Sequence, residues 1–76
     1  MDPLATALGQ NIRQIRKSRR ISQDKLSLLC EIDRSYMGRI ERGEVNLTIQ
    51  KLYRIAGALD CHPCDFLPDP SNLPAS

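Results

Sequence analysis

The sequence predicts an all-α domain. Apolar residues recur at helical spacing along most of the chain, and no stretch alternates between apolar and polar residues for more than a few positions. With 76 residues, 41% of them apolar and 26% charged, the composition is that of one small globular domain. No apolar stretch is long enough to cross a membrane, and no secretion signal is evident. Because three cysteines suit reduced thiols better than a disulfide framework, we expect a cytoplasmic protein.

Residues that favour helix ends divide the chain into segments. The predicted N-caps are Asp2, Ser22, Asp33 and Thr48. Pro3 suits the first position of a helix, and Gly43 suits the left-handed residue that ends one. Gly9 lies inside the first predicted helix, where glycine costs about 1 kcal/mol relative to alanine. We therefore expect the first turns of that helix to fray.

Each predicted helix has one apolar face. The faces consist of Leu4, Leu8, Ile12 and Ile15 in the first helix, Leu26, Leu29 and Cys30 in the second, Met37 and Ile40 in the third, and Ile49, Leu52, Ile55, Ala56 and Leu59 in the fourth. A short fifth helix begins at Pro63 and contains Phe66 and Leu67. The proline-rich remainder cannot continue a helix. We expect a five-helix domain over residues 1–67 and a flexible tail over residues 68–76.

Residues 23–42 have the spacing of a helix-turn-helix motif. Two short helices are separated by a tight break near residues 30–32. Ser27 provides a small side chain where the two helices cross, and Ile32 anchors the turn in the core. The pair is therefore the first candidate for a functional element.

The predicted third helix has a basic face. At about 100° per residue, five residues fall within an arc of roughly 140°, namely Arg34, Ser35, Gly38, Arg39 and Arg42. No acidic residue within the helix is placed to neutralise Arg39. A solvated surface is the alternative explanation, but an uncompensated arginine face favours contact with phosphates and guanines.

The distribution of charge also favours a polyanionic partner. Residues 1–20 contain five basic residues and one acidic residue, whereas residues 61–76 contain two acidic residues and no lysine or arginine. Two tyrosines and one phenylalanine are too few for the stacking platforms that single-stranded nucleic acids require. Double-stranded DNA is therefore the expected partner.

Arg16 and Glu41 are expected to form a structural ion pair. Arg16 borders the apolar face of the first helix, and Glu41 points toward the core side of the third without a basic partner at helical spacing. Removing one member of a partly buried pair costs several kcal/mol because the other stays desolvated. The alternative is that both are surface residues.

Several sequence segments together resemble a known family. They are Leu8–Arg13, Ile21–Leu26, Ser35–Gly43, Asn46–Leu52 and Ile55–Leu59. In combination they resemble the phage repressor and Cro class of helix-turn-helix proteins, also called XRE-like, with a lambda-repressor-like fold. Within that class, Asp33–Tyr36, Ile40–Gly43 and Asn46–Ile49 are most similar to the controller proteins of restriction–modification systems, which are short dimeric regulators.

The resemblance implies roles for individual side chains. Arg34, Ser35 and Arg39 would contact base edges, with the arginines preferring guanine. Gln23, Tyr36, Arg42 and Asn46 would contact phosphates. Two positions depart from the family pattern: Glu31 stands where the family prefers glycine in the turn, and Gly38 precedes Arg39 in the middle of the recognition helix.

Cys61-His62-Pro63-Cys64 is a second motif with possible chemistry. The spacing is that of redox motifs, and a nearby helix start lowers a thiol pKa. A zinc site would need Cys30 or a partner chain to complete its ligands. A purely structural role is the main interpretation, and redox sensing and metal binding are the alternatives. No catalytic set is recognisable, and no cofactor, metal or small-molecule ligand is expected.

The sequence leads to the hypothesis of a transcriptional regulator that binds a (pseudo)palindromic operator as a homodimer, acting as an autoregulatory repressor or activator. One recognition helix alone contacts too few base pairs to be selective, so two-fold symmetry is expected. The interface candidates are Val45, Leu47, Cys61, His62 and Phe66, with Leu28 as a further apolar position. Two alternatives remain: an antitoxin-like or coactivator-like protein-interaction module on the same fold, and a thiol-based redox switch on a DNA-binding scaffold.

Overall fold

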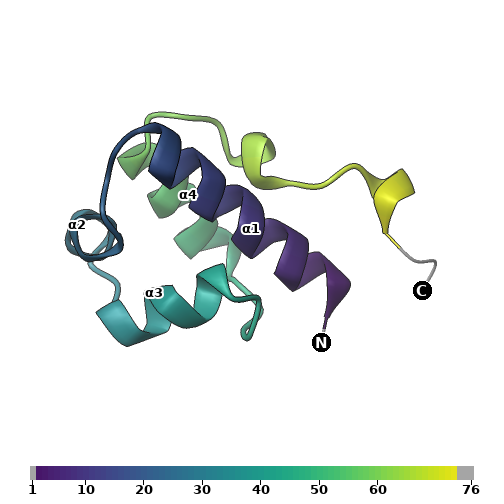
Figure 1. The fold of residues 1–76 in the computed structure, drawn as a ribbon, viewed down its shortest axis with the longest axis horizontal. Helices are drawn as coiled ribbons and strands as arrows, with labels where there is room; N and C mark the ends of the chain where they lie inside the picture. Colours follow the sequence, from purple (N-terminus) through teal and green to yellow (C-terminus); the bar gives the residue numbers. More distant parts are fainter. Residues whose placement is uncertain (1, 74–76) are drawn as a thin grey trace.

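The computed structural model describes residues 2–73, and within them all regular structure is helical (Figure 1). The α-helices are α1 (Pro3–Ser18), α2 (Gln23–Cys30), α3 (Arg34–Glu41) and α4 (Ile49–Ala58). The short 3-10 helices are η1 (Pro63–Phe66) and η2 (Pro70–Asn72). The predicted fold of four helices and a short fifth is confirmed, with η1 as the fifth. No described helix has the length and hydropathy needed to span a lipid bilayer.

The four α-helices begin at the predicted N-caps. The side chain of Asp2 accepts a hydrogen bond from Leu4 N at 2.9 Å, and Ser22 Oγ accepts one from Lys25 N at 3.0 Å. Asp33 accepts from Ser35 N at 3.0 Å and Tyr36 N at 3.3 Å, and Thr48 accepts from Lys51 N at 3.2 Å. These bonds satisfy backbone donors that have no partner within the helix.

The four α-helices also end in the same way. After each helix one residue has a positive φ, at Arg20 (58°), Glu31 (56°), Gly43 (74°) and Asp60 (55°). The next backbone N–H then donates back to the last turn of the helix, as Ile21 N does to Arg16 O at 3.2 Å and Glu44 N to Arg39 O at 2.9 Å. This is the Schellman arrangement. The stop at Gly43 was predicted from its glycine, and the family resemblance placed Glu31 at a turn position that favours glycine. The left-handed residues Arg20 and Asp60 were not predicted, because neither is glycine.

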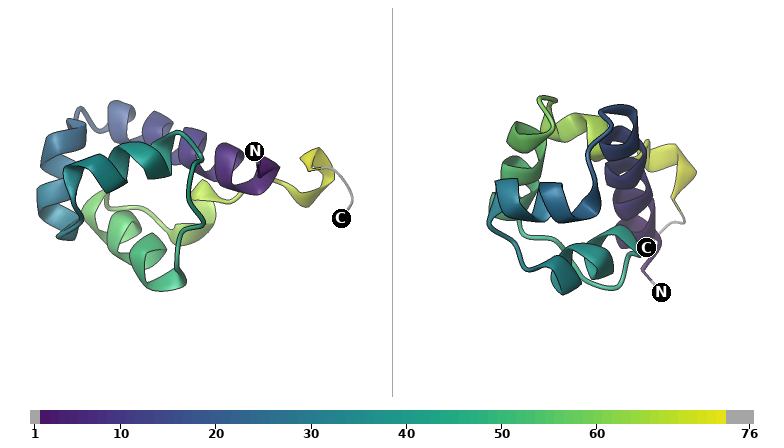
Figure 2. Two further views of the ribbon diagram at one scale, coloured as in Figure 1. Left: turned by 90° about the horizontal axis from the view of Figure 1, so that it is seen from below. Right: turned by 60° about the vertical axis from the view of Figure 1, so that its left-hand side comes forward.

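The core lies where α1, α2, α3 and α4 meet and is closed by η1 (Figures 1 and 2). Its fully buried large side chains are Ile12, Leu26, Met37, Ile55, Leu59 and Phe66. Ile32 anchors the turn between α2 and α3 in this core, as expected. Burial of these side chains is the main favourable term that holds the helices together.

Three residues were wrongly assigned to the buried apolar faces of their helices. Leu4, Leu29 and Ile49 are 47%, 50% and 73% exposed. Leu4 and Ile49 lie in the first turns of α1 and α4, and Ala5 instead of Leu4 is buried. The buried face of α2 runs through Leu26, Ser27 and Cys30, so Leu29 lies about 100° from its centre.

Gly9 does not mark a weak segment, because α1 is helical from Pro3 onward. A Cβ atom at Gly9 would lie 2.4 Å from Ile40 O and 2.7 Å from Glu41 O, both on α3. A Cβ atom at Gly43 would lie 2.5 Å from Thr6 Cα. The two glycines therefore let the backbones of α1 and α3 come into contact.

The predicted tail, residues 68–76, contains η2. Asp69 accepts a hydrogen bond from Ser71 N at 2.9 Å, which caps this single turn. This isolated turn, Pro70–Asn72, does not continue a preceding helix, and proline is well suited to its first position. Residues 74–76 lie outside the described residues, and the flexibility of the tail stays a prediction.

Candidate nucleic-acid interface

The helix-turn-helix pair consists of α2, a three-residue turn and α3. Glu31 adopts the left-handed conformation, with φ 56° and ψ 40°, at the position where glycine was expected. Ile32 N donates to Ser27 O at 3.0 Å, so the turn closes onto α2 despite the missing glycine. Ser27 is buried at the crossing, as expected. The strain of a non-glycine residue there is of order 1 kcal/mol.

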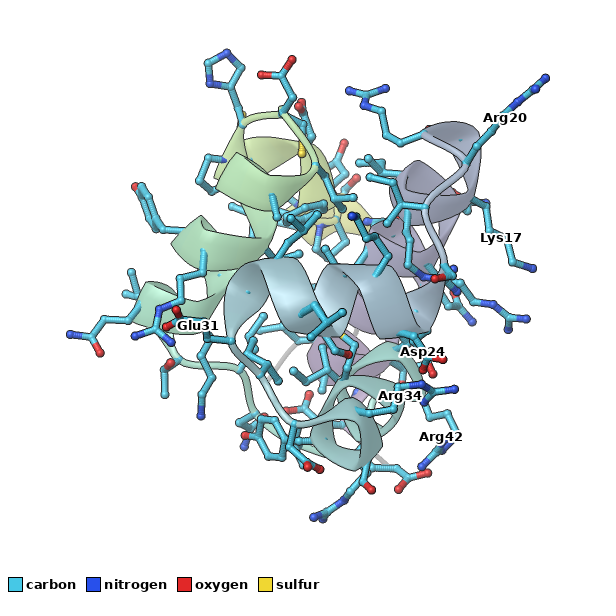
Figure 3. All side chains as sticks on the ribbon, turned by 90° about the vertical axis from the view of Figure 1, so that its left-hand side faces the viewer. Lys17, Arg20, Asp24, Glu31, Arg34 and Arg42 are labelled. Atoms are coloured by element: carbon cyan, nitrogen blue, oxygen red, sulfur yellow. The ribbon has the colours of Figure 1, made fainter. Side chains whose placement is uncertain are left out.

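The exposed side of α3 carries the predicted contact residues. Met37 and Ile40 are buried, so the opposite side of the helix faces solvent. More than half of the side chain of each of Arg34, Arg39 and Arg42 is exposed, and Ser35 is exposed as well. Figure 3 shows Arg34 and Arg42 together at the edge of the molecule. Three guanidinium groups and a hydroxyl thus lie on one accessible side.

The arginines of α3 are not uncompensated, which corrects the expectation from the sequence. Arg42 Nε donates to Glu44 Oε2 at 2.6 Å, and Arg39 Nε lies 3.8 Å from Glu44 Oε1. Arg34 pairs with Asp24 of α2 (Figure 3). The acids lie outside α3, so helical spacing within α3 does not reveal them. The hydrogen bond from Arg42 lowers the pKa of Glu44, and the same contact raises the pKa of Arg42.

Arg16 and Glu41 form a two-pronged ion pair inside the domain. Arg16 Nε lies 2.7 Å from Glu41 Oε2, and Arg16 Nη2 lies 3.0 Å from Glu41 Oε1. Both side chains are buried, and Arg16 Nη1 also donates to Ile21 O at 2.9 Å. Because α1 and α3 supply one partner each, the pair fixes the orientation of α3 relative to α1.

Gln23, an expected phosphate ligand, is also tied to this pair. Its Nε2 donates to Glu41 Oε1 at 2.9 Å. A shallow concavity of about 390 Å³ opens beside it, lined by side chains of α1, α2 and α3 that include Arg13, Arg34 and Arg42. The interior residue Gly38 belongs to the same lining, so its missing side chain leaves room there. Gln23 therefore borders a basic depression large enough for a phosphate group.

The sequence-based prediction did not include Arg13 among the residues of this candidate site. Arg13 lines the concavity from α1, one turn before Arg16. The available signal was its basic charge at helical spacing from Arg16, without an acid at helical spacing in the same helix.

Tyr36 and Asn46, the remaining expected phosphate ligands, lie on α3 and in the loop between α3 and α4. Tyr36 is half-buried, and Lys51 Nζ lies 4.6 Å from the centre of its ring. This cation–π contact helps to hold the ring in place. Asn46 is exposed in the loop before α4.

The Cys61–Cys64 segment has the surroundings of a structural element. Cys61 is half-buried against the core, and burial raises the pKa of its thiol, contrary to the expectation that a helix start lowers it. Cys64 and His62 are exposed. Among residues 2–73, no group of three or more His, Cys, Asp or Glu side chains is placed to hold a metal ion.

The prediction that Phe66 lies at a dimer interface is wrong. Phe66 is fully buried in the core of the protomer, and its carbonyl accepts a hydrogen bond from Asn11 Nδ2 at 2.8 Å. Val45, Leu47 and Cys61 are half-buried and pack against the core, whereas His62 and Leu28 are exposed. Ile49 and Tyr53 of α4 are 73% and 62% exposed and were not among the candidates.

Taken together, the five-helix arrangement and the α2–α3 pair define a helix-turn-helix protein. Residues 12–66 match the helix-turn-helix family HTH_3. The chain therefore belongs to this family and is a helix-turn-helix DNA-binding protein of the transcriptional-regulator class, as the XRE-like resemblance implied.

The similar proteins are regulators and not enzymes, which confirms the expectation of a non-enzymatic protein. The control protein C.BamHI of Bacillus amyloliquefaciens is 42% identical over 60 residues, which span 78% of this chain and 74% of that protein. The immunity repressor protein of Bacillus phage phi105 is 40% identical over 52 residues, which span 68% of this chain but 36% of the repressor. The crystal structure of the restriction-modification controller protein C.AhdI from Aeromonas hydrophila matches with a TM-score of 0.81 at 35% identity, covering 83% of this chain and 96% of that one.

Proposed function

We propose that the chain regulates transcription by placing α3 in the major groove of a specific double-stranded DNA site. The observation that carries this proposal is the exposed side of α3, where Arg34, Ser35 and Arg39 lie on a helix whose other side is buried. A helix presented in this way fits the width of the major groove. Similarity to proteins named as controllers and repressors supports the same function.

In this proposal Arg34, Ser35 and Arg39 contact base edges. The guanidinium group can donate two hydrogen bonds to O6 and N7 of guanine, and a serine hydroxyl can donate or accept. The carboxylates of Asp24 and Glu44 must release Arg34 and Arg39 when bases replace them as partners. Recognition is then an exchange of acceptors, in which only a well-placed guanine replaces the lost ion pair.

Gln23, Tyr36, Arg42 and Asn46 contact phosphates and set the position of α3 in the groove. Gln23 is the first residue of α2, where free backbone N–H groups and the helix dipole also favour an anion. Tyr36 binds from α3 itself and Asn46 from the loop that follows it. Contacts of this kind fix the register of the protein without reading the sequence.

The active form in this proposal is a homodimer on a (pseudo)palindromic operator. Two copies of α3 about one helical turn of DNA apart contact enough base pairs for selectivity. Val45, Leu47, Cys61 and His62 remain interface candidates. We add Ile49 and Tyr53 because their large apolar side chains are exposed on α4. Occupancy of the operator then depends on the concentration of the chain, as an autoregulatory repressor or activator requires.

The test is selection of bound duplexes from a random pool by the purified chain. The expected result is a consensus with two inverted half-sites about one helical turn apart, together with a dimer mass for the bound protein. A consensus without symmetry would contradict the dimer, and a pool that shows no enrichment would contradict sequence-specific DNA binding. Binding of an unrelated protein without DNA affinity would favour the interaction-module alternative.

A further inference from the structure

The exposed side of α1 carries a second set of basic side chains. Arg13, Lys17 and Arg20 follow one another at intervals of four and three residues and are all exposed. At this spacing Arg13 and Lys17 lie on one face of α1, and Arg20 follows just beyond its end. We call these three residues the α1 strip. The helix itself, Pro3–Ser18, contains no acidic residue.

The cations of the α1 strip differ from the other arginines at this end of the molecule. Within residues 2–73, no carboxylate lies within 4.0 Å of the charged groups of Arg13, Lys17 or Arg20. By contrast, Arg16 is bound by Glu41, and Arg19 Nε donates to Leu59 O at 2.9 Å. The neighbours of the strip on α1 include the neutral side chains of Gln10 and Gln14, which line a depression with Arg13 and Lys17. Within the described residues, no carboxylate therefore offsets the charge of the strip.

The α1 strip is continuous with the candidate interface. Arg13 lines the same concavity as Gln23, Arg34 and Arg42. In Figure 3, Lys17 and Arg20 lie on the same side of the molecule as Arg34 and Arg42 and extend that side away from α3. A rod-shaped polyanion that lies against α3 on this side has phosphates within reach of α1.

We infer that the α1 strip binds the phosphodiester backbone of duplex DNA next to the segment that α3 contacts. The inference rests on the proposed function, because it takes the duplex to be seated on α3. Ammonium and guanidinium groups without internal acid partners displace counterions from DNA at no loss of an internal ion pair. The glutamine amides beside them can donate further hydrogen bonds to phosphate oxygens. Binding at the strip is independent of sequence.

The experiment compares two variants that lower the net charge of the protein by the same amount. Arg13→Gln with Lys17→Gln removes two positive charges from the strip, and Arg54→Glu makes the same change in net charge on the exposed side of α4, which lies across the molecule from α1 in Figure 3. Affinity for a random-sequence duplex and for a duplex selected by the wild-type chain is measured over a series of KCl concentrations. The double variant should reduce the slope of log affinity against log salt by about 1.8, which at moderate salt is roughly a tenfold to fiftyfold loss on both duplexes.

A second measurement locates the contact on the DNA. Methylphosphonate linkages, which lack the phosphate charge, are placed in the selected duplex outside its consensus. They should weaken binding of the wild-type chain and leave the double variant almost unchanged. Arg54→Glu should respond to the modified duplex like the wild-type chain.

The outcomes separate this inference from the proposed function. If the wild-type chain binds no duplex, the proposed function fails and the inference fails with it. If the wild-type chain binds but the double variant keeps its salt slope, the inference is overturned and the proposed function stands. An equal loss in Arg54→Glu also overturns it, because net charge rather than the strip would then explain the effect.

Discussion

The basic side chains of α3 and those of α1 lie on adjoining surfaces but have different surroundings. Arg34, Arg39 and Arg42 each have a carboxylate partner, supplied by Asp24 or Glu44. The α1 strip has no such partner within residues 2–73. Arg34 and Arg39, which are expected to contact bases, are therefore already paired, and so is the expected phosphate ligand Arg42. The cations of the α1 strip, where contact is independent of sequence, have no carboxylate partner within the described residues.

The different surroundings separate selectivity for a DNA sequence from general attraction to DNA. An arginine that must give up a carboxylate gains from a guanine and gains little from an arbitrary base, so its pairing penalises wrong sites. A free lysine or arginine gains from any phosphate. We expect the α1 strip to dominate encounter with DNA and α3 to dominate the choice of site. Five predictions test how α1 and α3 are joined and which roles their basic side chains have.

The largest expected change is a loss of stability when the contact between α1 and α3 is removed. Arg16→Ala leaves Glu41 buried without its partner, and the free energy of unfolding should fall by about 3–5 kcal/mol. Urea denaturation of the variant measures this loss. Arg13→Gln, one turn earlier on the same helix and exposed, should leave stability nearly unchanged. An unaltered unfolding midpoint for Arg16→Ala would remove the ion pair as a stabilising contact.

The second prediction concerns the close approach of the same two helices. In an exposed helix, Gly→Ala stabilises by about 1 kcal/mol. Gly9→Ala should instead destabilise by about 2–3 kcal/mol, since its Cβ would meet the backbone of α3 at 2.4 Å. Gly57→Ala in α4 is the control, because nothing lies within 4 Å of its Cβ, and it should stabilise the fold. Opposite signs in two thermal melts support the contact, whereas equal signs contradict it.

The third prediction separates base contact from phosphate contact within α3. Arg39→Ala should weaken binding to the selected duplex by about 1–3 kcal/mol and relax the preference at one base pair. Arg42→Ala should weaken specific and random duplexes alike and lower the salt slope by about one. Competition titrations with both duplexes measure the two effects. Identical losses for the two variants on both duplexes would refute the assigned roles.

The smallest expected change is in DNA affinity when Glu44 is substituted. Glu44→Gln frees Arg39 and Arg42, so affinity for random duplex should rise a few-fold while affinity for the selected duplex changes less. Titrations against both duplexes provide the measurement. Glu31→Gln is the control, because this exposed carboxylate forms no ion pair within residues 2–73. Equal gains on both duplexes would show that Glu44 has no role in discrimination.

The pH dependence of Glu44 follows from the direction of its pKa shift. The hydrogen bond from Arg42 lowers the pKa of Glu44, so its stabilising contact is present above the unfolded-state pKa and is lost as the pH falls through the lowered folded-state pKa. Protonation releases the arginines. Affinity for random duplex should therefore rise on acidification in the wild-type chain and rise less in Glu44→Gln.

The fold was largely predictable because its signals are local. Asp33 as N-cap, Met37 and Ile40 as the buried face of α3, and Gly43 as its stop are all short-range patterns, and the structure confirms each. The pairing of Arg16 with Glu41 could also be inferred, because each was a charged residue next to an apolar face without a local partner. Such a charged residue needs an oppositely charged partner from a segment distant in the sequence.

The remaining features depend on contacts between segments. The role of Gly9 appears only when the backbone of α3 lies against α1, since helix propensity alone assigns glycine a cost. Glu44 reaches Arg39 because the left-handed residue Gly43 turns the chain back, and the five-residue separation is not a helical spacing. The exposure of Ile49 likewise depends on which side of the first turn of α4 is covered.

The helix ends have a consequence for engineering this domain. Arg20, Glu31 and Asp60 occupy left-handed positions that L residues with a Cβ atom adopt at a cost of about 1 kcal/mol each. Asp60 is exposed and lies outside both surfaces assigned to DNA, so glycine or asparagine there offers additional thermal tolerance without altering which sequences are bound. At Glu31 the same substitution would relax the joint between α2 and α3, so stability and the presentation of the recognition helix would change together.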